Sequence, residues 1–425
     1  YSIGNNVDEM GQALYIATFR KQWRDVRRFL PAYQRLEGHD PMLVHYAAGG
    51  LARGSGHFGE AERQYRALLA IRPDFLLGQL ELARTLFEMH KDVEAKQAFI
   101  TAKAQLAGGG EQATGVLRTV DLFLAALRKR NGWQGSLAIG PGYSSNLNQS
   151  SASYTCLLAT ADGTCLFDRK VPDAITSTGI SFEATLGRRI PLSGHGAIRG
   201  RVIAFGDIYP GHHDYSQATL TTRIGYDYQA ARDAITLSPS FDLGTLGSSI
   251  LYRAWGVNAE WTHTLSAKAM VKLEGNVRTF TYPLPGYAPQ DGRMVDLFLT
   301  GWYMLPHGWA LLGGPDFVDK SADDPVNAYR LWGGRLGISK AFGNSVSILL
   351  LGAARQRDYR AYSELFEARR RDRERVYTGI LRIPALKFLG LTPEAIVQHN
   401  CVTSNIDWLY SYKRTTASLR LSLNF

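Results

Sequence analysis

YSYKRTTASLRLSLNF, at Tyr410–Phe425, is the stretch that decides the fold. From Ala417 onward apolar and polar residues alternate strictly, so the leucines and Phe425 share one face and Arg420 lies on the other. A period of two predicts a strand with one face in an apolar medium and the other in water. The edge of a soluble β-sandwich shows a similar alternation, but it rarely ends on Phe. We interpret the stretch as the closing strand of an outer-membrane β-barrel.

Other segments of the chain repeat this alternation. Leu251–Leu265, Gln217–Tyr228 and Met270–Thr279 each place apolar residues on one face and polar or charged residues on the other. Charges such as Glu260 and Arg278 would destabilise the dry core of a sandwich, whereas a water-filled lumen accepts them. The pattern therefore favours a membrane barrel over a soluble β-protein.

The connections between the strands indicate the topology. Counting them gives about 14 antiparallel strands, each long enough for a tilted span. An even count returns both ends of the barrel to the side of the preceding domain, which we expect to be the periplasm. Short connections alternate with longer ones, as expected of periplasmic turns and extracellular loops. The longer ones are predicted at Ser144–Pro172, Tyr209–Asp214, Gly244–Ile250, Tyr282–Asp291, Phe317–Asn327, Asp358–Arg371 and Cys401–Tyr410.

Composition limits the other possibilities. No segment approaches the roughly 18 apolar residues of a membrane-spanning helix. No signal peptide is visible, and because a barrel must be exported, we expect the numbering to start on a processed chain. The net charge of +10 comes largely from one helical cluster, Arg20–Arg28, and one strand cluster, Arg369–Arg375. Neither has the aromatic platforms of nucleic-acid readers, so we expect solvated faces, or anionic lipid headgroups against the second cluster.

The front of the chain, from Val7 to about Arg130, has helical spacing and an internal repeat. A shift of 34 residues aligns Ala61 with Ala95 and Tyr65 with Phe99. This period is the signature of tetratricopeptide (TPR) helix pairs, in which small residues allow close helix crossing and aromatic residues fill the gap between repeats. We predict two clear repeats, one degenerate repeat before them and a capping helix near Gln112–Arg130.

These observations predict two domains, a TPR-like helical domain at residues 1–130 and a 14-stranded barrel at residues 131–425. Stacked helix pairs leave a concave face that usually holds a peptide or partner protein. Four residues are candidates for lining this groove, although simple surface exposure explains them nearly as well: Tyr46, Arg53, Arg84 and Phe87.

The cysteines suggest one disulfide, and neither they nor the histidines suggest a catalytic or metal site. Cys156 and Cys165 lie close together in a polar segment, where an oxidising compartment would join them and the alternative is two free thiols. The 10 histidines are scattered, and none has partners at metal-ligand spacing. No nucleophile-elbow, P-loop or zinc-protease motif is present. We therefore expect no enzyme activity and no cofactor; an outer-membrane lipase or protease is the minor alternative.

Three patches carry a resemblance to a known family. Gly142–Asn148 follows the first predicted strand, Gly390–Pro393 opens the penultimate one, and Ser404–Ile406, Tyr410–Arg414 and Phe425 close the chain. In this order they resemble the surface lipoprotein assembly modulators, the Slam family, which join a periplasmic TPR domain to a 14-stranded barrel. The residues that carry the resemblance are Ser145, Asn146, Asn148, Gly390, Thr392, Pro393, Ser404, Asn405, Tyr412, Arg414 and Phe425. A structural role is at least as plausible for them as contact with a client.

The resemblance implies an outer-membrane translocon that delivers lipoproteins, or related small haem- or iron-acquisition proteins, to the cell surface. Its partners would be a client lipoprotein or haemophore-like protein, outer-membrane lipid and lipopolysaccharide, and the barrel-assembly machinery. An exporter of exopolysaccharide, which also joins TPR repeats to a barrel, is the alternative. A third possibility is a passive porin with an accessory domain.

Overall fold

The computed structural model describes residues 6–107 and 113–425, and the chain divides into two compact units. The first unit contains the helices up to Gly132 together with the segments Arg189–Ile198 and Tyr228–Ala231. The second unit contains the remainder of the chain from Trp133 onward. The last helix of the first unit ends at Asn131, beside the boundary predicted after residue 130.

The helices of the first unit follow one another as pairs and a final single helix. Asn6 and Asp40 cap the first and third helices, each accepting a hydrogen bond from a backbone N–H two residues later. The predicted capping helix is present, except that Gln112 lies outside the described residues. The helices are α1 (Val7–Phe19), α2 (Trp23–Gln34), α3 (Pro41–Gly54), α4 (Phe58–Ile71), α5 (Leu76–Glu88), α6 (Asp92–Leu106) and α7 (Thr114–Asn131).

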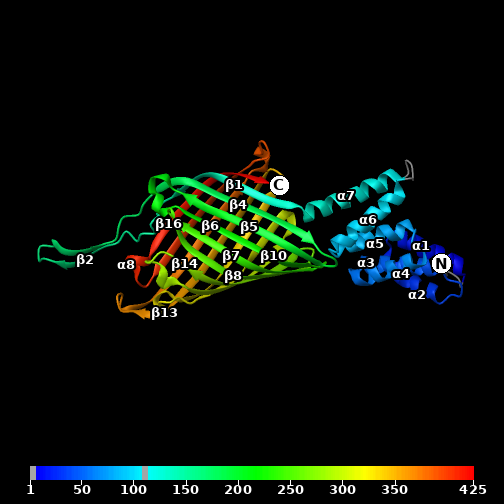
Figure 1. The fold of residues 1–425 in the computed structure, drawn as a ribbon, viewed down its shortest axis with the longest axis horizontal. Coiled ribbons are helices and arrows are strands. Elements are labelled where there is room, and N and C mark those ends of the chain that lie inside the picture. The colour runs from blue at the N-terminus through cyan, green and yellow to red at the C-terminus, as the bar shows by residue number, and fades with distance from the viewer. Residues whose placement is uncertain (1–5, 108–112) are drawn as a thin grey trace. The chain divides into compact units, whose positions relative to one another are not determined.

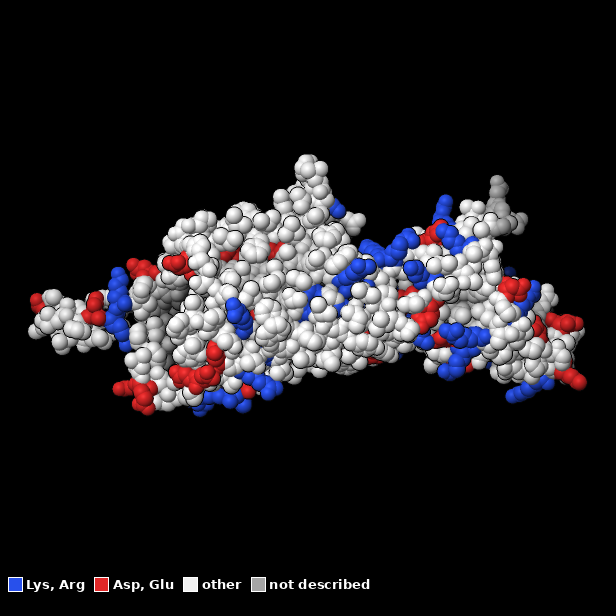
Figure 2. All heavy atoms as spheres, viewed as in Figure 1, with Lys and Arg blue, Asp and Glu red and all other residues white. Residues whose placement is uncertain are grey.

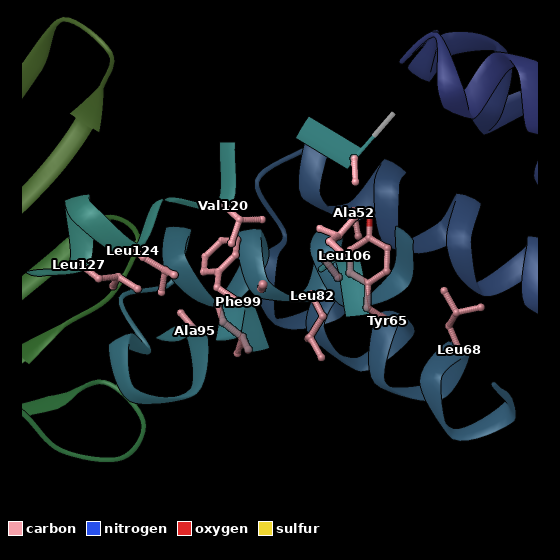
Figure 3. Packing of buried hydrophobic residues seen from close by; sticks show 14 residues of the cluster. Ala52, Tyr65, Leu68, Leu82, Ala95, Phe99, Leu106, Val120, Leu124 and Leu127 are labelled. Carbon is pink, nitrogen blue, oxygen red and sulfur yellow. The ribbon is translucent and has the colours of Figure 1, made fainter. Parts of the chain in front are cut away.

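The aromatic residues that recur in the 34-residue repeat lie in the core of the helical unit. Tyr65, Phe99 and Ala95 are fully buried in this core (Figure 3). Ala61 is also fully buried, and the two alanines leave room for their partner helices. A Cβ atom at Gly49 would lie 2.8 Å from the ring of Tyr65, so α3 can approach α4 this closely only with glycine there. The repeat predicted from the sequence is therefore a packing unit. None of the helices in the described residues is long and apolar enough to cross a membrane.

The second unit is a closed antiparallel barrel, which confirms the predicted strand count. Within residues 133–425, all of which the structure describes, 14 strands pair in a ring that β16 closes against β1 (Figure 1). The barrel strands are β1 (Trp133–Ser144), β4 (Ser177–Pro191), β5 (Gly196–Ile208), β6 (Gln217–Gln229), β7 (Asp233–Leu246), β8 (Ser249–Ser266), β9 (Ala269–Thr281), β10 (Gly292–Met304), β11 (Trp309–Lys320), β12 (Tyr329–Phe342), β13 (Val346–Ser363), β14 (Ala368–Arg382), β15 (Thr392–Ser404) and β16 (Tyr412–Asn424).

The barrel wall has an apolar outer face and a polar inner face. On β8, Trp255 is 68% exposed on the outside, whereas Asn258 is 1% exposed on the inside. On β16, Leu419 and Leu421 face outward, while Arg420 between them faces inward. Because no water is available to unpaired backbone groups in hydrocarbon, closure of the ring is what allows these strands to cross a membrane.

Two of the predicted long loops are wrong. The chain turns from β7 to β8 within residues 247–248, and from β13 to β14 within residues 364–367, because both hairpins continue to pair beyond the expected ends. Asp358 and Arg371 are cross-strand partners, and the Arg371 Nε lies 2.7 Å from the Asp358 Oδ1. Opposite charges that face each other across two strands stabilise the pairing, so both strands continue through the predicted loop.

The connection between β1 and β4 contains a hairpin that the sequence did not predict. Strands β2 (Tyr154–Ala159) and β3 (Cys165–Lys170) form a separate two-stranded sheet that projects from the barrel (Figure 1). A disulfide joins Cys156 to Cys165, and Cys401 is a free cysteine. The disulfide constrains a hairpin that two strands alone would barely stabilise.

Candidate functional site: a helical face and a charged barrel interior

Three of the four predicted groove residues lie together on α3 and α5. Arg53 is central, since its guanidinium lies 3.2 Å from the Glu81 carboxylate and 3.0 Å from the Glu88 carboxylate. Arg84 lies 3.4 Å from Glu81 on the same helix. We call Tyr46, Arg53, Glu81, Arg84 and Glu88 the α3–α5 face. Glu81 and Glu88 are not among the residues predicted from the sequence, although both lie one helical turn from Arg84.

Tyr46 provides the apolar end of this face. Its ring packs edge-on against Tyr65 and Phe75, with centroids 6.5 Å and 6.2 Å away. Burial raises the pKa of the Tyr46 phenol, and the negative charge of Glu81 raises it further. The hydroxyl therefore stays protonated and can donate a hydrogen bond.

Phe87, the fourth predicted residue, does not belong to the α3–α5 face. It packs edge-on against Phe123 of α7, with centroids 5.0 Å apart, and the Arg130 guanidinium lies 4.2 Å from its ring centre. Two nearby contacts join α6 to the same helix: the fully buried Asp92 carboxylate lies 2.8 Å from the Arg130 guanidinium and accepts a hydrogen bond from Asn131. These contacts fasten both α5 and α6 to α7.

Two ionisable groups of the first unit are shifted by their surroundings. Burial would raise the pKa of Glu62, but hydrogen bonds from Lys91 and Arg66 outweigh it, so the pKa lies below its ordinary value. Burial lowers the pKa of His90, and the positive charge of Arg130 lowers it further. Because each pKa is shifted in the folded state, the protonation of both groups makes the stability of the helices depend on pH.

Many charges on the inner face of the barrel lie beside charges of the opposite sign. Arg278 bridges two strands, with its guanidinium 3.0 Å from Asp242 and 2.6 Å from Asp296. Arg223 lies 3.1 Å from Glu260 and 3.5 Å from Glu274, and Lys272 contacts both glutamates. Arg420 lies 2.6 Å from Glu394. Such pairing lowers the cost of holding charged side chains on the inner wall.

The outer surface of the barrel carries fewer charges than its inner face. In the view of Figure 2, the middle of the barrel wall shows few charged atoms, and charged residues gather toward its ends. An apolar outer band with a polar interior is the surface of an outer-membrane barrel. Among the described residues, no group of three His, Cys, Asp or Glu side chains gathers as metal ligands would.

The first family patch fixes the loop after β1. Ser145 exchanges hydrogen bonds with Thr415 of β16, its N–H donating to the Thr415 carbonyl and its hydroxyl accepting from the Thr415 N–H. The Asn146 amide donates to the carbonyls of Ser150 and Lys413, and Asn148 bonds the backbone of Asp173 and Ile175. These side chains hold the β1–β16 seam and its loop.

The remaining family residues lie at both ends of β15 and β16. The Asn405 amide bonds the backbone of Arg369 and Arg371, and the Ser404 hydroxyl accepts from the Ile406 N–H. At the other end, Gly390 has φ +85° and precedes Thr392 and Pro393, which open β15. The backbones of Phe425 and Gly135 exchange two hydrogen bonds. Tyr412 and Arg414 lie at the start of β16.

Comparison with known proteins follows the same two-part plan. Residues 133–425 match the family model for the surface lipoprotein assembly modifier, and residues 2–99 match its N-terminal TPR repeats. A hemophilin secretion modulator of Acinetobacter baumannii is 36% identical across 100% of this chain and 87% of its own length. Surface lipoprotein assembly modifier 1 of Neisseria meningitidis is 24% identical across 99% of this chain and 83% of its own length.

Among solved structures, the outer-membrane channel DcaP of Acinetobacter baumannii matches 69% of this chain and 96% of its own, with 10% identity and a TM-score of 0.42. The family assignment depends on the sequence matches, which cover the barrel and most of the helices in one order. The chain belongs to the surface lipoprotein assembly modifier family.

Proposed function

We propose that this protein is an outer-membrane translocon that delivers a lipoprotein, or a related small haem- or iron-acquisition protein, to the cell surface. The observation that carries the proposal is the whole-length similarity to a hemophilin secretion modulator, in a chain that joins TPR-type helices to a closed barrel with a polar interior. In this proposal the protein transports its client and no residue acts as a catalyst.

The helical unit would engage the client before passage. The α3–α5 face supports this role because it combines an aromatic ring, a phenol kept protonated and both signs of charge on adjacent helices. Such a surface can pair with charged groups of an extended polypeptide while the ring contacts an apolar side chain. Phe87 is left out of this role because α7 covers it.

The barrel would give passage through the membrane. Paired charges along the inner wall keep it wet without presenting a single-sign field that would retain a charged client. We place the helical unit in the periplasm, because α7 leads directly into β1 and the even strand number returns Phe425 to the same end. The barrel would then contact outer-membrane lipid and lipopolysaccharide, and its insertion would depend on the barrel-assembly machinery.

Reconstitution tests the proposal. The full chain is placed in proteoliposomes with candidate client proteins encoded near its gene, and passage is followed by protease accessibility of the client. We expect at least one candidate to cross with this chain and none to cross with a porin of similar size. If no candidate crosses and an exopolysaccharide does, the protein is a polysaccharide exporter instead.

A further inference from the structure

The outer wall of β12–β15 is ordered in rows by the pairing register. Outward-facing residues include Trp332, Leu336, Leu350, Tyr377 and Val397, all of them exposed large side chains. Because side chains alternate along each strand, every second residue from these also faces outward. The register places Leu336, Gly352, Tyr377 and His399 in one row, and Gly334, Ala354, Arg375 and Cys401 in the row next to it.

A band of arginines begins in that next row and runs toward the β13–β14 turn. On β14, every second residue from Arg369 to Arg375 is an exposed arginine on the outer face. Arg330 of β12 and Arg360 of β13 extend it sideways. We call Arg330, Arg360, Arg369, Arg371, Arg373 and Arg375 the arginine band.

The arginine band keeps a positive excess. Its carboxylate partners are Asp319, which pairs with Arg330 and Arg360, and Asp358, which pairs with Arg371. Six arginines therefore face two carboxylates. A cleft of about 610 Å³ is lined by four residues of the band, together with Trp332, Asp358 and Arg370; the four are Arg330, Arg360, Arg369 and Arg371. Guanidinium groups that converge on a cleft form a site for phosphate, which they bind through paired hydrogen bonds.

Next to the arginine band, the same wall is hollowed and apolar. Gly352 and Gly379 remove two outward side chains, and a hollow of about 680 Å³ forms there with Leu336, Leu350, Tyr377 and Val397 in its lining. A Cβ atom at Gly379 would come no closer than 3.6 Å to Leu350, and one at Gly352 no closer than 4.0 Å to Tyr377. The neighbouring side chains of the outer wall therefore leave room for a Cβ atom at both positions.

The two features have the spacing of one lipid molecule. Along β14, Gly379 follows Arg375 by four residues, or about 13 Å of strand, so an acyl chain in the hollow would bring its headgroup to the arginines. The band extends over three strands, about 10 Å, and along β14 for about 20 Å. That area exceeds one phosphate and fits two phosphates held apart on a disaccharide, as in lipid A.

We propose that the arginine band and the hollow beside it form one binding site for lipopolysaccharide, with the lipid A phosphates on the arginines and an acyl chain over Gly352 and Gly379. The site rests on the orientation in the proposed function, in which the β13–β14 turn lies at the outer leaflet, where this lipid resides. A bound lipid would cover the charged end of this wall with its own anionic headgroup.

Retention of lipopolysaccharide by the purified full chain tests the site, measured by native mass spectrometry after titration in detergent. We expect Arg373→Ala/Arg375→Ala to weaken binding about tenfold through loss of two charge-assisted contacts. Gly379→Leu should weaken it about threefold by filling the hollow. Arg24→Ala/Arg28→Ala removes the same charge from exposed positions on α2, and Gly301→Leu adds the same side chain to an open outward position on β10.

The controls should bind as the unchanged protein does, and heat-modifiable gel mobility confirms that each barrel is folded. Equal retention by the arginine variant and its control would overturn the site. Equal loss of lipopolysaccharide and phosphatidylglycerol would overturn the choice of lipid. If Gly379→Leu keeps lipopolysaccharide but slows export of a lipidated client, the hollow holds the client's acyl chain instead. Failure of the unchanged chain to export any client contradicts the proposed function, whereas lipid retention tests this site alone.

Discussion

The Arg420 guanidinium lies 2.6 Å from the Glu394 carboxylate, on the inner face of the barrel where β15 pairs with β16. Glu394 also pairs with Arg382, while a second carboxylate, Glu183, lies 3.4 Å from Arg420. Arg420 lies on the face that the alternating pattern at the C-terminus predicts to be wet. Its pairing with Glu394 explains how a strand with an arginine among leucines closes the barrel.

Removing Glu394 should therefore destabilise the barrel. In Glu394→Ala, Arg420 and Arg382 lose a shared partner, and we expect a loss of about 1–3 kcal/mol in the free energy of unfolding. Urea titration of the protein in lipid vesicles measures it. Glu183→Ala is the matched control, because Glu183 is half exposed and contacts Arg420 at a longer distance, so its effect should be clearly smaller. Equal effects would contradict this role of Glu394.

The α3–α5 face should contribute to client binding. Arg84→Glu places a third acid beside Glu81 and Glu88, and we expect an affinity for an acidic client segment about tenfold lower. Binding of fluorescent client to the full chain measures the change. Arg63→Glu, on the exposed side of α4, makes the same charge change away from this face and should leave affinity unaltered. A similar loss in both variants would show only the effect of net charge.

The helices should lose stability as the pH falls below the ordinary His90 pKa of 6.5. The folded state keeps this pKa low, so the unfolded chain takes up the proton first, and stability decreases from about pH 6.5 down to the folded pKa. Thermal melting of the helical circular dichroism signal between about pH 7.5 and 5 measures this. His90→Asn suits the positive φ of 61° and should flatten the dependence. An unchanged slope in that variant would assign the pH effect to other groups.

The disulfide should matter to the hairpin and not to the barrel. In Cys156→Ser/Cys165→Ser, we expect faster protease cleavage within β2–β3, because two strands without a cross-link are marginally stable. The free energy of unfolding of the barrel should change by less than about 0.5 kcal/mol, since the hairpin forms its own sheet. Cys401→Ser is the control and should alter neither quantity. A barrel destabilised along with the hairpin would mean that the two fold together.

The sequence predicted the barrel well because its signal is local. Each strand shows its own alternation, and Trp255 and Asn258 lie on the faces that their spacing indicates. The TPR helices were found for the same reason, since Tyr65 and Phe99 recur at a fixed period. Pairing partners are not local, and so the contact of Asp358 with Arg371, and with it the length of β13 and β14, could not be predicted.

The candidate site was predicted less completely. Tyr46, Arg53 and Arg84 do come together, but Glu81 and Glu88, which neutralise Arg53, were missed because their role depends on how α3 packs on α5. Phe87 has the spacing of a groove residue, yet α7 covers it, and helical spacing alone does not predict which later helix covers a face.

Passage of the client through the barrel interior is tested most directly by photocrosslinking at two neighbouring positions of β8. A benzoylphenylalanine is placed at Glu260, which faces inward and contacts Arg223, or at Trp261, which faces outward. Export of a client is then arrested by a tightly folded C-terminal fusion. If the client passes through the barrel interior, we expect the arrested client to crosslink to position 260 and not to position 261. Crosslinks from position 261 alone, or continued export with no crosslink from position 260, would contradict it.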